Sequence, residues 1–155
     1  MFVSLQFKLE MKKEDKEKLI KLMRKQSSAI RLAYNMLRDL EKDKTKNLYA
    51  RIYQRIKHLF PELPTKYIDS AIYKAKQYPT DKPVVSGGKR LFEKLCKNHL
   101  VGKARERLKK QWKEQRQGTL ISVGSKADKG NRLTRFENIN GQIHLRITTG
   151  NREFI

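Results

Sequence analysis

The spacing of apolar residues changes at Gly118, and this change restricts the chain to a mixed fold. Before Gly118, apolar residues recur every three or four positions, which is the spacing of one helix face. After Gly118 they alternate with polar residues, as in a half-buried strand. We predict helices over residues 13–40, 47–60, 64–78, 91–96 and 101–116, and strands over residues 119–123, 133–138 and 142–148. The fold class is therefore α+β.

Residues 3–9 also alternate between apolar and polar side chains, which predicts a strand at the start of the chain. A lone strand exposes unpaired backbone groups, so we expect it to pair with the C-terminal strands. The chain would then divide into two domains. Residues 1–10 and 118–155 would form a small antiparallel β-barrel or sheet, interrupted by a helical insertion over residues 11–117.

Two further signals concern the C-terminal strands. Asn140-Gly141 is a strong signal for a two-residue hairpin turn between residues 133–138 and 142–148. Residues 152–155 resemble the start of another strand, at which the sequence stops. We therefore expect the chain to be a fragment of a longer protein.

The chain is strongly basic, with 37 Lys and Arg against 16 Asp and Glu, a net charge of +21. No apolar run approaches the roughly 20 residues needed to span a bilayer, and the start lacks a signal-peptide pattern. The single cysteine, Cys96, rules out an internal disulfide framework. Charge alone does not separate nucleic acid from membrane surfaces or acidic proteins. We expect a nucleic-acid partner, no membrane partner and a cytoplasmic location.

Charge is densest between Lys89 and Arg116, where eleven basic residues stand against three acidic ones. Lys89 and Arg90 open this stretch. The predicted helix over residues 101–116 combines an inward apolar stripe with cations on its other faces, so it can lie along a phosphate backbone. The stripe is Val101, Ala104, Leu108 and Trp112, and the cations are Lys103, Arg105, Arg107, Lys109, Lys110, Lys113 and Arg116. The alternative is an ordinary solvated helix face.

A second candidate anion site is the loop over residues 124–132. Small residues there let backbone N–H groups approach an anion, and cationic side chains supply charge. The candidate ligands are Lys126, Lys129, Asn131 and Arg132. The loop does not match the phosphate-cradling pattern of nucleotide hydrolases, so nucleotide hydrolysis is unsupported. An ordinary hairpin loop is the alternative.

Residues 47–60 and 65–78 form a helix–turn–helix-like pair. The second helix carries three lysines and three tyrosines that can contact nucleic acid by charge and by base stacking. The candidates for stacking are Tyr67, Tyr73 and Tyr78. Two packed helices joined by a proline-containing turn are more commonly plain scaffold.

The sequence offers no catalytic constellation. Cys96 and His99 are two potential zinc ligands, but a structural zinc site needs four. The acidic residues form no set that we can place together around two magnesium ions. We therefore expect no metal, no cofactor and no enzymatic activity in this chain.

Several runs resemble the N-terminal half of TnpB proteins, transposon-encoded relatives of compact type V CRISPR nucleases. They are RLAYN at residues 31–35, FEKL at 92–95, LKKQWKEQRQGTL at 108–120 and VGSKADKGNR at 123–132. The resemblance implies a wedge-like β-barrel interrupted by a helical recognition domain, which together grip a guide RNA and double-stranded target DNA. The nuclease domain of that family lies downstream, so the resemblance implies binding without cleavage for this chain.

Two other functions remain open from the residues alone. One is a self-contained RNA-binding or ribosome-associated basic protein. The other is a DNA-binding regulator that uses the helix pair over residues 47–78.

Overall fold

The computed structural model describes residues 8–40, 47–81, 84, 88, 89, 92, 93, 97, 100–124, 129–150 and 153–155. Its helices are α1 (Lys13–Leu40), α2 (Leu48–Leu59), α3 (Thr65–Lys76) and α5 (Lys103–Gln117). Its strands are β1 (Thr134–Ile139), β2 (Gln142–Gly150) and β3 (Glu153–Phe154). The α+β class is confirmed. Lys89, Phe92, Glu93 and Lys97 are also helical, whereas Leu91, Leu95 and Cys96 of the predicted 91–96 helix lie outside the described residues.

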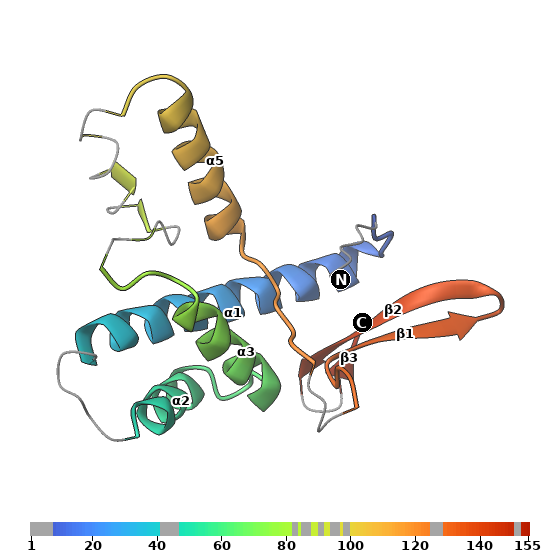
Figure 1. Cartoon of the computed structure of the whole chain (residues 1–155). Coiled ribbons are helices and arrows are strands. Elements are labelled where there is room, and N and C mark those ends of the chain that lie inside the picture. Colours follow the sequence, from blue (N-terminus) through green and yellow to red (C-terminus); the bar gives the residue numbers. More distant parts are fainter. Residues whose placement is uncertain are drawn as a thin grey trace.

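The long helix α1 is the axis of the helical body, and α2 and α3 pack against it (Figure 1). Its bounds match the predicted 13–40 helix, and Glu14 and Asp15 lie in its first turn, where carboxylates suit the positive end of the helix. The core between α1, α2 and α3 is built on small and branched side chains. Fully buried members include Ala29, Ala33, Ile52, Ile56, Ile68, Ala71 and Ile72.

The sheet is antiparallel and open, with strand order β1-β2-β3. The predicted hairpin turn is confirmed: Asn140 and Gly141 have φ angles of 52° and 81°, as a two-residue hairpin turn requires. The Asn138 side chain supports the turn by accepting a 3.0 Å hydrogen bond from the Gly141 N–H. The β1–β2 register runs from Thr134 opposite Ile147 to Ile139 opposite Gln142.

The base of the hairpin belongs to the same core as the helices. Leu133 and Ile147 are 6% and 5% exposed and join the helical cluster. The Tyr67 hydroxyl of α3 donates a 2.9 Å hydrogen bond to the Thr148 carbonyl of β2. Toward its tip the hairpin leaves the body, and Ile143 is 78% exposed (Figure 1).

The proposed division into residues 1–10 with 118–155 and residues 11–117 stays a prediction.

Residues 118–124 form a connecting segment that links α5 to the sheet across α1 and α3. We predicted a strand over residues 119–123, and this is wrong because no strand pairs with it in the described part of the chain. Helix side chains satisfy its backbone instead. Three alternate amides donate to side-chain oxygens: Thr119 N–H to Ser27 Oγ (3.0 Å), Ile121 N–H to Gln26 Oε1 (2.6 Å) and Val123 N–H to Ser70 Oγ (3.3 Å).

Gln26 makes the pairing with Ile121 two-sided, because its Nε2 also donates to the Ile121 carbonyl at 2.6 Å. Gln26, Ser27 and Ser70 are buried, and buried polar groups are stable when they are hydrogen-bonded. The segment begins at Gly118, whose φ is +93° and whose backbone passes close to α1. A Cβ at that position would lie 2.9 Å from the backbone carbonyl of Met23.

The N-terminal segment differs from the predicted strand where it is described. Lys8 and Leu9 have no strand conformation, so the strand prediction is wrong for these two residues. Residues 1–7 lie outside the described residues. No helix of the described chain is long and apolar enough to cross a membrane.

Candidate nucleic-acid interface

Helix α5 extends away from the body formed by α1, α2 and α3 (Figure 1). All seven of its predicted nucleic-acid-binding cations are exposed: Lys103, Arg105, Arg107, Lys109, Lys110, Lys113 and Arg116. Within the described part of the chain, none of them forms an ion pair with an acidic side chain. This helix therefore presents a concentrated positive charge to solvent.

The apolar stripe of α5 packs less deeply than the sequence predicts. Val101 precedes the helix and is 81% exposed, and Ala104 is exposed as well. Leu108 and Trp112 are half-buried, and the Trp112 ring stacks on Phe92 with centroids 4.8 Å apart. The prediction that the whole stripe packs inward is wrong because only its second half finds apolar partners.

The second half of α5 also fixes one cation. The Arg116 guanidinium lies 5.4 Å from the centroid of the Trp112 ring, within the range of a cation–π interaction. The Trp112 Nε1 is buried and makes no hydrogen bond in the described structure. The tryptophan thus supports the basic face through its ring.

The other predicted cations are spread over two places. Lys89 is exposed and lies 3.7 Å from Glu93, one helical turn away, which partly neutralises it. Arg90 and Lys126 lie outside the described residues. Lys129 and Arg132 are exposed near the base of the hairpin, and Lys129 has a φ of 52°.

Asn131 has a structural role that the loop pattern did not predict. Its Oδ1 accepts hydrogen bonds from the Ser122 hydroxyl at 2.7 Å, the Leu133 N–H at 3.0 Å and the Thr134 N–H at 3.3 Å. Its Nδ2 donates to the Ser122 carbonyl at 3.3 Å. The amide therefore joins the connecting segment to β1, and a contact between Asn131 and nucleic acid stays a prediction.

The three predicted stacking tyrosines have different surroundings. Tyr67 is fully buried, so its ring has no face open to a base, and burial raises the pKa of its hydroxyl. Tyr78 is half-buried and packs edge-on against Tyr34 with centroids 6.0 Å apart. Tyr73 is 54% exposed. The stacking prediction is wrong for Tyr67, and Tyr73 offers the most accessible ring of the three.

Helix α3 has little free surface for a DNA groove. Six of its twelve residues are buried, and five of these belong to the core with α1 and α2. A recognition helix places its exposed side chains in the major groove. The buried half of α3 therefore serves as scaffold, and groove binding by its other half stays a prediction.

The β1–β2 hairpin carries a second basic surface that the sequence patterns did not predict. Arg135 of β1 lies directly opposite Arg146 of β2, and His144 is opposite Glu137 on the same face. Arg146 Nη1 donates to Glu137 Oε1 at 3.0 Å, and its guanidinium lies 3.6 Å from the centroid of the Phe154 ring. Alternation along β2 separates Arg146 from Ile147, but only the pairing register brings Arg135 beside it.

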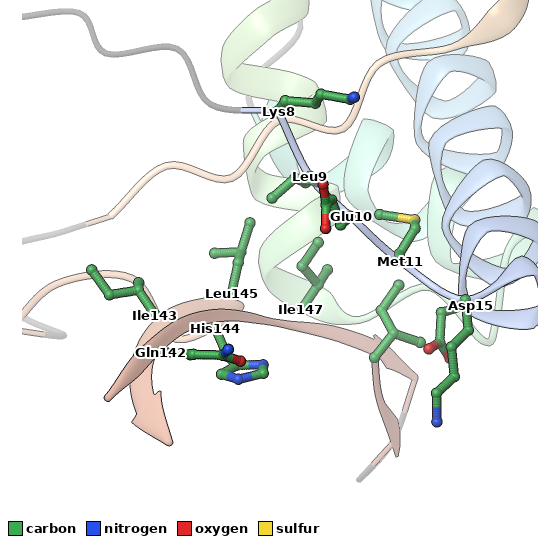
Figure 2. A pocket seen from close by; sticks show the side chains of 12 residues that line it. Lys8, Leu9, Glu10, Met11, Asp15, Gln142, Ile143, His144, Leu145 and Ile147 are labelled. Atoms are coloured by element: carbon green, nitrogen blue, oxygen red, sulfur yellow. The ribbon is translucent and has the colours of Figure 1, made fainter. Parts of the chain in front are cut away.

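A cavity with a volume of about 580 Å³ lies between residues 8–12 and β2 (Figure 2). Leu145 and Ile147 extend from β2 on the side of Leu9 and Met11, whereas His144 lies on the other side of the strand. Six of the twelve lining residues are apolar, and the other six are polar or charged. Among the described residues, no three His, Cys, Asp or Glu side chains are grouped as a metal site.

Comparison with known proteins gives one match. The model of a family described as the SSO2105 N-terminal domain matches residues 2–155. No curated protein and no solved structure matches the chain. Because the match spans nearly the whole chain, the chain belongs to this family.

Proposed function

We propose that this member of the SSO2105 N-terminal domain family binds nucleic acid, with α5 as its principal contact. The observation that carries the proposal is the set of seven exposed cations on α5, none of which forms an ion pair with a described acidic side chain. Desolvation would oppose burying such a group of like charges against protein, whereas a polyanion would offset every one of them. A nucleic-acid backbone supplies that charge in a regular array.

The dimensions of α5 suit a phosphate backbone. Fifteen residues at about 1.5 Å each give a helix of roughly 22 Å. Duplex DNA carries one negative charge for about every 1.7 Å of its axis, so several phosphates lie within reach of the helix. Each phosphate that a lysine or arginine neutralises releases condensed counterions, and this release favours binding at low salt.

The more specific part of the proposal is that the chain grips a guide RNA and a target DNA duplex, as the N-terminal portion of a TnpB-like protein. Two of the runs that carry the TnpB resemblance cover the second half of α5 and residues 123–132. The β-barrel implied by that resemblance would need further strands along β2. Among the described residues, β3 and Ile155 pair with residues 147–150, and no strand pairs with the same edge of β2 from Ile143 to Arg146.

The test is a comparison of two triple variants by fluorescence anisotropy with labelled duplex DNA and structured RNA. In the first variant Lys109, Lys113 and Arg116 are replaced by Gln, which preserves helix propensity. At about 0.1 M salt, the loss of three phosphate contacts should weaken duplex binding by two to three orders of magnitude.

The matched control replaces Lys12, Lys13 and Lys16 by Gln at the start of α1. These lysines are also exposed, but residues 10–18 contain four basic and four acidic side chains, so the net charge of this stretch is zero. We expect a loss below about tenfold in the control. Equal losses in the two variants would contradict α5 as the contact, and no binding of either nucleic acid by the wild type would contradict the function.

The same proposal holds that the isolated chain does not cut nucleic acid. Incubation of the labelled duplex and RNA with the protein and Mg²⁺ or Mn²⁺ should leave them intact. Metal-dependent cleavage that disappears when one of the acidic residues of this chain is replaced would show that it is an enzyme.

A further inference from the structure

The pairing register of the hairpin puts two arginines side by side. Arg135 and Arg146 are direct cross-strand partners, so both side chains extend from the same face. Like charges directly opposite one another destabilise a sheet. Such a local conflict is expected where a site serves binding rather than stability.

Only one of the two arginines has its charge compensated. Arg146 is bound by Glu137 on one side and covered by the Phe154 ring on the other. In the described part of the chain, no acidic group forms an ion pair with Arg135, which is exposed. An anion placed between the two guanidinium groups would turn their repulsion into a shared attraction.

The space beside these two arginines is a small cavity of about 160 Å³. Its described lining contains three arginines, one hydroxyl and two apolar side chains, and no acidic residue. The lining residues are Arg132, Leu133, Arg135, Arg146, Thr148 and Phe154. The apolar walls exclude water from one side of a bound anion. This exclusion strengthens the attraction between the anion and the arginines.

We infer that this cavity binds one phosphate of a nucleic-acid backbone. The inference rests on the proposed function and adds to it a defined contact outside α5. A guanidinium fork matches the oxygens of a phosphate and makes two parallel hydrogen bonds to them. Arg135 supplies that fork, Arg146 is held in place by Glu137 and Phe154, and the Thr148 hydroxyl is a further donor.

Arg135→Gln tests the cavity because binding and stability should move in opposite directions. Nucleic-acid affinity should fall by roughly tenfold, the value of one charge-assisted contact. The slope of log affinity against log salt should become shallower by about 0.9 for duplex DNA. The urea midpoint should stay the same or rise, because the repulsion with Arg146 is removed.

Two further variants separate charge from geometry. Arg135→Lys keeps the positive charge but loses the fork, so it should retain the wild-type salt slope and lose part of the affinity. Arg55→Gln removes an exposed arginine from α2, on another part of the surface, and should change the affinity by less than about twofold and leave the salt slope unchanged.

The outcomes separate this inference from the proposed function. Wild-type affinity and slope in Arg135→Gln, with a wild-type protein that binds nucleic acid, would overturn the cavity and leave the function standing. A wild type that binds no nucleic acid would overturn both. Free inorganic phosphate has the same chemistry as a backbone phosphate, so it is the alternative ligand of this cavity. An NMR titration that follows the Arg135 Nε–H during addition of inorganic phosphate tests this alternative. Saturation by phosphate, with unchanged nucleic-acid affinity of Arg135→Gln, would assign the site to free phosphate and overturn the inference.

Discussion

Gln26 offers the sharpest test of how the connecting segment is held. Replacing it with Leu keeps a side chain of similar size in a position that is fully buried. The substitution removes the two 2.6 Å hydrogen bonds to the Ile121 backbone and the 3.3 Å bond to the Tyr67 carbonyl. The Ile121 N–H and C=O then lose their partners.

The magnitude follows from those two backbone groups. A buried polar group left without a partner costs about 1–3 kcal/mol. Ile121 is half-buried, so water reaches part of it, and we expect a combined loss of about 2–4 kcal/mol in the free energy of unfolding. That is a large share of the roughly 5–15 kcal/mol typical of a folded domain.

Urea unfolding followed by far-ultraviolet circular dichroism measures this loss. Gln54→Leu, at an exposed position of α2, is the matched control and should stay within about 0.5 kcal/mol of the wild type. If Gln26→Leu also stays within that range, side chains of the helices do not hold the connecting segment, and our account of residues 118–124 fails.

Two further predictions concern the fold. Gly118→Ala should cost more than about 1 kcal/mol in urea unfolding, because Ala disfavours φ of +93° and its Cβ would meet the Met23 backbone at 2.9 Å; an unchanged midpoint would contradict this close approach. Tyr67→Phe should cost about 1 kcal/mol at neutral pH through the lost hydrogen bond to Thr148. Burial raises the pKa of Tyr67, so its ionisation opposes folding: the contribution is complete below about pH 10 and is lost as the pH rises further. Urea midpoints between about pH 9 and 11 should therefore fall less steeply in the Phe variant, and parallel curves would exclude Tyr67 as a cause.

The elements that were predicted well are a helix with one continuous apolar face and a turn that depends on adjacent residues. The 28 residues of α1 carry an uninterrupted helical stripe, and its predicted bounds are confirmed. The Asn140-Gly141 turn depends on the φ angles of two adjacent residues, so a short sequence determines it.

The connecting segment was mispredicted because its partners are distant in sequence. Residues 119–123 are extended, as their branched side chains indicate, but their amides bind side chains more than 50 residues away. The sequence did contain a hint. Gln26 lies on the buried stripe of α1, four residues after Leu22 and three before Ala29, and a buried glutamine needs partners.

In the candidate site, too, the features that depend on local sequence were predicted, and those that depend on distant contacts were not. The exposed cations of α5 follow from helical periodicity and charge alone. Tyr67 was misassigned because its ring is buried in a core formed by residues distant in sequence, which no local pattern reveals. The structural role of Asn131 was missed because it depends on Ser122, nine residues away. Arg135 was missed because only the β1–β2 register places it beside Arg146.

The salt dependence of duplex binding is the sharpest test of α5 as the nucleic-acid contact. If five of the seven α5 cations engage phosphates, log affinity should fall with log salt at a slope of about −4 to −5. The variant with Lys109, Lys113 and Arg116 replaced by Gln should show a slope of about −2, and the variant at Lys12, Lys13 and Lys16 should keep nearly the wild-type slope. Equal slopes for all three proteins would contradict the assignment of α5 as the nucleic-acid contact.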